Sequence, residues 1–502
     1  MQETVLQTPV MTDTADIVSR TTRSGAIMFI VKVLRHGFAF LVQFMLLNLL
    51  NPSDFGLMRY VTIVLSVISL VNELGLSVAI VQKKVLTKDE AASAFTLSIV
   101  AGILFYSIIF ISAPLLSAVF NAPLLTDLIR VGGLTVFFGS FSVVQKSLLQ
   151  RDMRFGTLGL IELVTALAGS GAALILAFLG HGVWSLVVSL LVYNVLSSIC
   201  FLIASPLPKG RFFNLNTARP LWVFGLLMIG QRCIDFATAN LDFLVVGRVF
   251  GEYLLGIYGF SFDLVKMPQI AFSVILTPVI LSTFSRIQEN PQQIRRGFLL
   301  MTELVVAVSI PFLVSVFCLT DELLYVVGIF RKNNVWISAK GPLKVLALVG
   351  LIYTFSSLPG AVWISVGKLK TRVIWSAAMG LSVAIALLLG SQYGLMGVCW
   401  AMLIRAVVSF PPLLYVNKSI LGVKPMEYIL ALLPSVISGT LLCFTEIAII
   451  NAFPGSSAQR NVFVLAGSIV CGLLIYFLVY SIIWKDKVRN LKDLFLQVLK
   501  RK

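Results

Sequence analysis

The amino-acid sequence predicts an all-α polytopic membrane protein with 14 transmembrane helices, arranged as two parallel six-helix lobes around a central cavity plus two C-terminal helices. Composition indicates the class, because 58% of the 502 residues are hydrophobic and only 12% are charged, whereas about a quarter of a soluble domain is charged. The placement of basic residues indicates how the helices are oriented. A repeat within the chain indicates the two lobes.

Fourteen apolar runs are long enough to cross the hydrocarbon core, which takes about 20 residues. Polar breaks set the ends of these runs. The expected spans have the approximate limits 25–49, 55–81, 92–118, 126–147, 156–179, 182–204, 220–246, 252–284, 297–319, 342–365, 371–391, 396–417, 427–452 and 461–484.

Lysine and arginine gather in alternate loops, and the loops that carry them are expected to be cytoplasmic. Of the 39 Lys and Arg residues, 26 fall on one side of the expected spans, with Lys146 counted among these loop cations, 5 on the other and 8 within spans. Both termini are therefore predicted to be cytoplasmic. The first 24 residues lack the apolar core of a signal peptide. Residues 485–502 predict a basic amphipathic helix on the anionic inner leaflet, or alternatively a solvated tail.

An internal repeat divides the chain into two halves. An offset of 200 residues, drifting to about 214, pairs Lys32 with Arg232, Phe55-Gly56-Leu57 with Leu255-Gly256-Ile257, and Phe141-Ser142 with Phe355-Ser356. Six spans are an even number, so both lobes enter the membrane from the same side. The expected organisation is an N-terminal tail (1–24), N-lobe (25–204), cytoplasmic linker (205–219), C-lobe (220–417), the last two spans (418–484) and a C-terminal tail (485–502).

Cations inside the first span form the strongest candidate binding site. Lys32, Arg35 and His36 lie at positions i, i+3 and i+4, so they share one helix face. At 1.5 Å per residue they lie roughly 10 to 17 Å inside the membrane. Burying such groups is costly, so they are expected to line a wet cavity or to make a structural contact between helices. A cavity lined by them attracts anions.

Other ionisable residues complete the expected site. The repeat places Arg232 opposite Lys32, and Arg59 either faces the cavity or reaches the headgroups. The predicted substrate-binding residues are Lys32, Arg35, His36, Arg59, Arg232 and Lys266. The predicted ion-coupling carboxylates are Glu73, Asp235 and Asp263, although intrahelical pairs with Arg232 and Lys266, and polar packing for Glu73, are the structural alternatives. Six further charged residues are expected to serve packing or the interface: Arg130, Glu162, Glu303, Lys344, Arg405 and Glu446.

Several classes of function are not expected. A stretch that begins at Gly360 lacks the spacing of a phosphate-binding loop. No long extramembrane segment is predicted that could carry the catalytic residues of an enzyme. The two histidines and six dispersed cysteines argue against a metal centre, a cofactor or a disulfide framework. The net charge of +17 lies mainly in the loops on one side of the membrane, so nucleic acid is not an expected partner.

The chain resembles the polysaccharide transporter family, the Wzx-type oligosaccharide flippases of the superfamily that includes multidrug exporters and the lipid II flippase. The resemblance covers nearly all of residues 25–420. It rests on Phe55-Gly56-Leu57, Leu74-Gly75-Leu76, Val81-Gln82, Leu149-Gln150-Arg151-Asp152-Met153-Arg154-Phe155, Gly182-Val183-Trp184-Ser185-Leu186, Gly256-Ile257-Tyr258, Pro268, Pro278, Phe284-Ser285-Arg286-Ile287-Gln288, Pro342-Leu343-Lys344-Val345 and Gly367-Lys368.

This resemblance implies transport of an undecaprenyl-pyrophosphate-linked oligosaccharide across the bacterial cytoplasmic (inner) membrane during exopolysaccharide, capsule or O-antigen assembly. It also implies alternating access, coupling to H⁺ or Na⁺, and a polysaccharide polymerase or export machinery as partner. Pyrophosphate suits Lys32, Arg35 and Arg232, with Arg35 as the best bidentate partner. Two alternatives remain: a cation-coupled multidrug or small-molecule antiporter of the same fold, and a non-transporting membrane partner in a synthase assembly.

Overall fold

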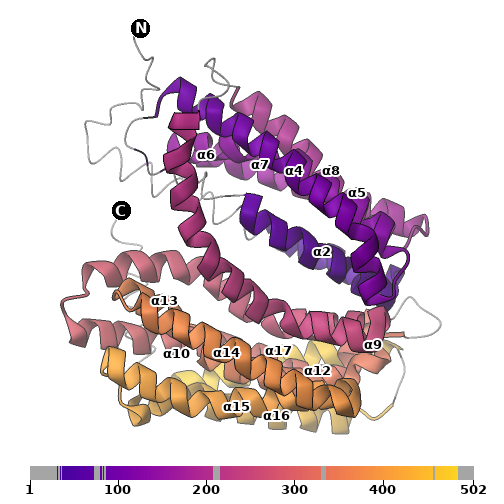
Figure 1. Cartoon of the computed structure of the whole chain (residues 1–502). Coiled ribbons are helices and arrows are strands. Elements are labelled where there is room, and N and C mark those ends of the chain that lie inside the picture. The colour runs from indigo at the N-terminus through magenta and orange to yellow at the C-terminus, as the bar shows by residue number, and fades with distance from the viewer. Residues whose placement is uncertain are drawn as a thin grey trace. The chain divides into compact units, whose positions relative to one another are not determined.

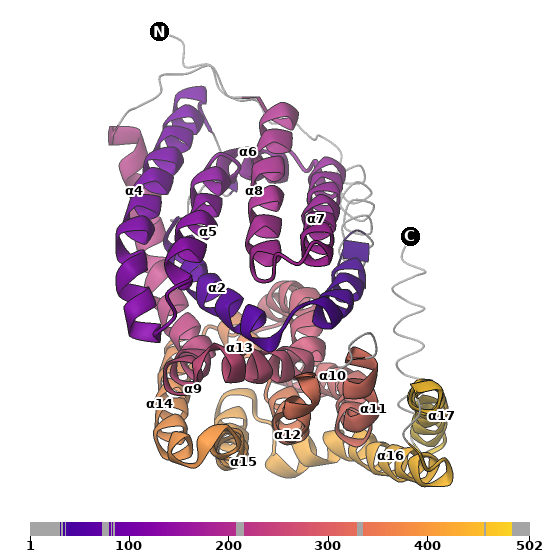
Figure 2. The same ribbon diagram turned by 90° about the vertical axis from the view of Figure 1, so that its right-hand side faces the viewer.

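The computed structural model describes residues 31, 34–35, 37–72, 80–81, 83, 86–206, 215–328, 335–455 and 458–483. These residues form helices and no strand (Figures 1 and 2). Contacts divide the chain into two compact units, Met1–Gly256 and Ile257–Lys502. This boundary lies beyond the predicted linker at 205–219, and the predicted lobe limits stay a prediction. The predicted tails 1–24 and 485–502 lie outside the described residues.

The first unit contains helical residues Gly37–Leu49 followed by a helical bundle. Helix α4 packs on α5, α5 packs on α8, and α7 packs on α8, as Figure 2 shows. The helices are α2 (Pro52–Asn72), α4 (Lys88–Phe120), α5 (Leu125–Ser140), α6 (Val143–Arg151), α7 (Phe155–Phe178), α8 (Trp184–Ala204) and the first part of α9 (Leu215–Arg286).

The second unit repeats this packing scheme. Helix α10 packs on α12, α12 on α15, and α14 on α15, while α16 packs on both α10 and α17. After the remainder of α9, its elements are α10 (Pro291–Cys318), α11 (Thr320–Val327), η1 (Val335–Ala339), α12 (Lys340–Phe355), α13 (Pro359–Ser365), α14 (Leu369–Gly390), η2 (Ser391–Tyr393), α15 (Gly394–Leu421), α16 (Pro425–Ala452) and α17 (Ala458–Ile483).

Ten stretches of the described residues are long and apolar enough to cross a membrane. One of them, Ile234–Ser273, takes in parts of two predicted spans, and another, Leu369–Leu421, takes in the whole of two. Residues within the first two predicted spans are only partly described. The protein is therefore an all-helical membrane protein, and the count of fourteen spans stays a prediction.

Two predicted spans are broken in the structure. The expected spans 126–147 and 342–365 lie within two of the candidate membrane spans, Leu125–Arg151 and Val335–Ser365. The first is divided between α5 and α6, and the second between α12 and α13. Both breaks fall at the repeat-related dipeptides Phe141-Ser142 and Phe355-Ser356. The carbonyls released by a break must be satisfied inside a membrane. Ser198 donates to the Phe138 carbonyl at 2.5 Å, and the Tyr428 hydroxyl donates to the Phe355 carbonyl.

A second repeat-related feature is a close helix crossing within the first unit. A Cβ added to Gly56 would lie 1.8 Å from the Glu252 carbonyl oxygen, and a Cβ added to Gly256 would lie 1.8 Å from the Pro52 carbonyl oxygen. Both pairs of positions obey the 200-residue offset of the repeat, so the crossing is reciprocal. Small residues allow such close backbone approach between membrane helices. Just before this crossing, Gly251 breaks the helical path of α9 with φ at 80°, a conformation that favours glycine.

Candidate anion-binding site

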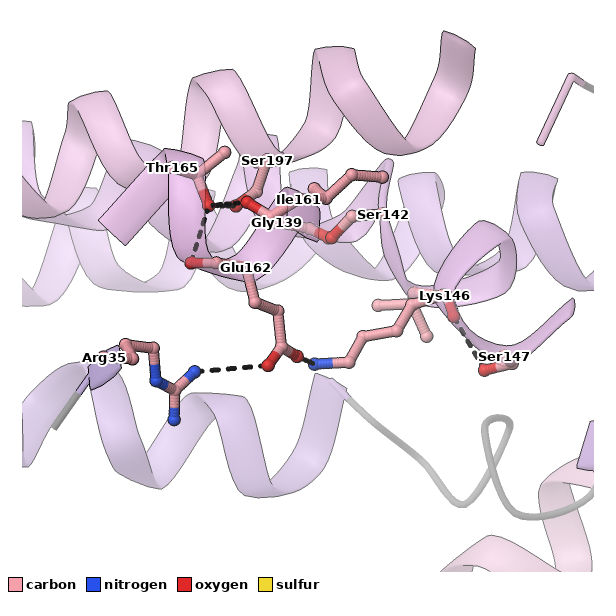
Figure 3. A network of polar contacts seen from close by, with 10 residues as sticks. Arg35, Gly139, Ser142, Lys146, Ser147, Ile161, Glu162, Thr165 and Ser197 are labelled. Atoms are coloured by element: carbon pink, nitrogen blue, oxygen red, sulfur yellow. Dashed lines mark hydrogen bonds and ion pairs between the residues drawn. The ribbon is translucent and has the colours of Figure 1, made fainter. Parts of the chain in front are cut away.

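A cluster of three charged side chains lies inside the first unit (Figure 3). The Glu162 carboxylate accepts from Arg35 Nη1 at 3.2 Å through Oε2 and from Lys146 Nζ at 2.7 Å through Oε1. Arg35 is 127 positions from Glu162 in sequence and Lys146 is 16 positions from it, and the three residues come from three helical elements. Each carboxylate oxygen is therefore held by a different cation.

The break between α5 and α6 positions one of these cations. Lys146 lies in the first turn of α6, and its backbone N–H donates to the Ser142 carbonyl at 2.9 Å. Glu162 lies on α7, seven residues after the helix begins at Phe155, or roughly 10 Å along its axis. The short helix α6 packs on α7, so the lysine reaches the carboxylate from the neighbouring element.

Contacts to α8 fix the part of α7 that carries Glu162. Thr165 lies one turn further along α7 and donates through Oγ1 to the Ile161 carbonyl at 2.7 Å. Ser197 of α8 donates to Thr165 Oγ1 at 3.1 Å. One turn beyond Thr165, a Cβ added to Gly169 would lie 3.0 Å from the Ser189 carbonyl oxygen of α8. The carboxylate therefore projects from a firmly packed helix pair.

The cluster carries an excess positive charge, since two cations share one carboxylate. The Glu162 side chain is 9% exposed, whereas the Arg35 and Lys146 side chains are 27% and 39% exposed. The carboxylate is thus covered while the cations remain accessible. Among the described residues, Arg35 uses only Nη1 for a hydrogen bond, and its guanidinium carries five N–H donors in a planar fork. The arrangement can accept a further anion without breaking the existing pairs.

Several residues predicted for the site fall outside the described residues. Lys32, His36 and Glu73 are not described, and of Arg232 the structure gives the helix but not the side chain. Their proposed roles stay predictions. Arg35 is the member of the predicted first-span face that the structure places in a charged cluster.

The other predicted residues that the structure describes make contacts of their own. Arg59 stacks over the Phe243 ring at 4.4 Å, and Lys266 stacks over the Phe262 ring at 4.0 Å. Such cation–π contacts stabilise a partly buried cation. Asp235 belongs to the first unit, whereas Lys266 and Asp263 belong to the second. These four charged residues each have further interaction partners.

Sequence reasoning missed two members of the cluster. Lys146 was expected to be a cytoplasmic loop cation, and Glu162 was expected to be a packing residue. The signal that points to them is an ionisable side chain within an apolar span, because such a group must find a partner. The sequence contains that signal for Glu162 but does not say which cation supplies the partner.

The arginines of the Leu149–Phe155 motif have structural roles. Arg151 Nη1 donates to the Ile80 carbonyl at 2.9 Å and also to the Lys83 carbonyl. Arg154 donates to the Ala204 carbonyl at 3.3 Å. The motif thus links the end of α6 and the turn that follows it to two other parts of the first unit. In the described part of the chain, no group of three His, Cys, Asp or Glu residues could hold a metal ion.

Solved structures share this fold. The chain aligns with the lipid II flippase MurJ in an inward closed conformation with a TM-score of 0.70, covering 91% of this chain and 100% of that chain at 16% identity. A likeness at this level of identity concerns the fold alone. The chain therefore shares the helical membrane fold of that protein.

Sequence relatives place the chain in a family. Residues 45–328 match the family described as polysaccharide biosynthesis protein, and the chain belongs to this family. It is 25% identical over 344 residues to the teichuronic acid biosynthesis protein TuaB of Bacillus subtilis, covering 68% of this chain and 70% of that protein. It is 23% identical over 410 residues to the lipopolysaccharide biosynthesis protein WzxC of Escherichia coli, covering 80% and 82%. The protein is thus a membrane protein of polysaccharide biosynthesis.

Proposed function

We propose that the protein is a flippase that carries undecaprenyl-pyrophosphate-linked oligosaccharide from the cytoplasmic to the outer leaflet of the bacterial cytoplasmic membrane. The product would supply the assembly of exopolysaccharide, capsule or O-antigen. Membership of the polysaccharide biosynthesis family and a fold shared with a lipid II flippase support this proposal. The protein performs no covalent chemistry in it, and the substrate leaves unchanged.

The observation that carries the proposal is the cluster of Arg35, Lys146 and Glu162. A pyrophosphate is a compact polyanion, and two cations around one covered carboxylate leave a net positive charge to receive it. Arginine and lysine together offer a planar fork and a point charge, which are common phosphate partners. In the predicted orientation this cluster lies toward the cytoplasmic ends of its helices, where a substrate made in the cytoplasm would enter.

The proposed mechanism is alternating access by two six-helix lobes among fourteen spans, with both termini cytoplasmic. Proton or sodium coupling would use Glu73, Asp235 or Asp263, and a polymerase or export machinery would receive the product. Lys32, His36 and Arg232 are proposed to extend the site beyond Arg35. Arg59 and Lys266, which stack on aromatic rings, are proposed to contact the substrate when the lobes move.

The alternative is a cation-coupled multidrug or small-molecule antiporter. A site for cationic drugs requires a carboxylate with unsatisfied charge. In this cluster both oxygens of Glu162 are already paired with cations, which favours an anionic substrate. A non-transporting partner in a synthase assembly needs no such excess of accessible cations.

Replacing Lys146 with alanine is expected to slow leaflet transfer roughly tenfold. One charge-assisted contact to phosphate contributes about 1.5 to 3 kcal/mol, and a lysine, which is a point charge without a planar fork, falls at the lower end of that range. The assay follows a fluorescent undecaprenyl-pyrophosphate glycan in proteoliposomes of the purified protein. Lys83→Ala is the matched control, since Lys83 also pairs with a glutamate, Glu90, at similar exposures of 37% and 12%.

Equal losses in the two lysine variants would argue against the assigned site, because both changes remove one Lys–Glu pair. Unchanged transfer in Lys146→Ala would remove Lys146 from the proposal. Thermal unfolding midpoints of both variants show whether any loss of transfer comes from loss of folded protein.

A further inference from the structure

Two cysteines from distant parts of the chain meet in the second unit. Cys318 is the last residue of α10, and Cys443 lies on α16. Their Sγ atoms are 3.0 Å apart, although the residues are separated by 125 positions in sequence. A disulfide bond is about 2.05 Å long, so a shift of about 1 Å would bond the two sulfurs. Side-chain rotation can supply much of such a shift.

A buried carboxylate lies beside this pair. Glu446, three residues after Cys443 on α16, is fully buried, and its Oε1 accepts from the Ser315 hydroxyl at 2.5 Å. The Cys318 thiol interacts with the same carboxylate. The other oxygen, Oε2, is buried without a hydrogen-bond partner in the described part of the chain. A carboxylate in this position can accept the proton of the Cys318 thiol.

The packing around the two cysteines is compatible with a covalent link between α10 and α16. Helix α16 packs on α10 over much of its length, and a Cβ added to Gly439 would lie 2.5 Å from the Ile310 side chain. The two helices are therefore already held close where the cysteines meet. In the predicted orientation α10 ends on the outer side of the membrane, which is the oxidising side in bacteria.

We propose that Cys318 and Cys443 form a disulfide that joins α16 to α10. The inference rests on the predicted orientation of the helices. The Cys318 thiolate attacks a disulfide donor, forms a mixed disulfide and releases one donor thiolate. The Cys443 thiolate then attacks the Cys318 sulfur and releases the second. The two cysteines lose two electrons, the donor gains them, and the two thiol protons end on the released donor thiols. Glu446 accepts the proton of the Cys318 thiol and then passes it to the released donor thiolate.

The test counts thiols in the full-length protein taken directly from cells. Membranes are lysed in N-ethylmaleimide, the protein is purified and denatured without reductant, and alkylated cysteines are mapped by mass spectrometry. The proposal predicts alkylation of four of the six cysteines. After reduction, a second alkylating reagent should label Cys318 and Cys443 alone.

Single substitutions sharpen this result. Cys318→Ser should leave Cys443 alkylated before reduction, and Cys443→Ser should do the same for Cys318. Cys200→Ser is the control, since Cys200 lies in the first unit. This variant should keep the disulfide between Cys318 and Cys443. Alkylation of all six cysteines without reduction, or a disulfide between any other pair, would overturn the inference. The count requires no transport, so either outcome leaves the flippase proposal to its own test.

Discussion

Arg35→Ala is expected to slow leaflet transfer of an undecaprenyl-pyrophosphate glycan by roughly 10- to 100-fold, the range for losing a charge-assisted hydrogen bond of about 1.5 to 3 kcal/mol. The guanidinium holds Glu162 through a single nitrogen. Its remaining donors can form the planar fork that suits phosphate. The rate of transfer in proteoliposomes measures the effect.

Two further arginine variants separate binding from folding. Arg35→Lys keeps the charge but loses the fork, so its transfer rate should lie between those of the wild type and Arg35→Ala. Arg154→Ala removes one hydrogen bond to the Ala204 carbonyl and should transfer at nearly the wild-type rate. If Arg35→Ala transfers as fast as Arg154→Ala, Arg35 does not bind the substrate.

Gly256→Ala should strongly destabilise the protein. The added Cβ would lie 1.8 Å from the Pro52 carbonyl oxygen, and a backbone atom cannot swing aside as a side chain can. Overpacking ordinarily costs about 1 to 3 kcal/mol, and this backbone contact places the cost at or above the upper end of that range. A lower thermal unfolding midpoint of the detergent-purified protein measures it.

Gly171→Ala is the matched control for this crossing, because no atom lies within 4 Å of a Cβ at that helical glycine. It should keep or raise the midpoint, since alanine is favoured over glycine inside a helix. Gly56→Ala should behave like Gly256→Ala. The double variant should lower the unfolding midpoint by less than the sum of the two single decreases, because both added methyl groups push apart the same helix crossing. A wild-type midpoint for Gly256→Ala would show that the crossing is looser than described.

The repeat is the part of the architecture that the sequence conveys best. The 200-residue offset pairs Gly56 with Gly256, and these are the glycines that cross. The dipeptides Phe141-Ser142 and Phe355-Ser356, paired at 214, mark the two helix breaks. Hydropathy alone could not reveal the breaks, because each break lies within a stretch that is, taken as a whole, long and apolar enough for a single membrane span.

The charged cluster was only half predictable. The depth of Arg35 in the first span indicates that it needs a partner, but hydropathy and spacing do not say which residue provides it. Lys146 reaches Glu162 because the chain breaks before α6, which is a matter of tertiary structure. The meeting of Cys318 and Cys443 is likewise invisible in sequence spacing, since it depends on how α16 packs against α10.

The protein is proposed to move a lipid-linked glycan by recognising an anionic headgroup. The most direct test compares two substrates that carry the same fluorescent oligosaccharide, one linked through undecaprenyl pyrophosphate and the other to an uncharged polyprenyl carrier. The account predicts that the pyrophosphate substrate changes leaflets at least about tenfold faster, equivalent to about 1.4 kcal/mol. Equal rates for the two carriers, or no transfer of either above protein-free vesicles, would contradict it.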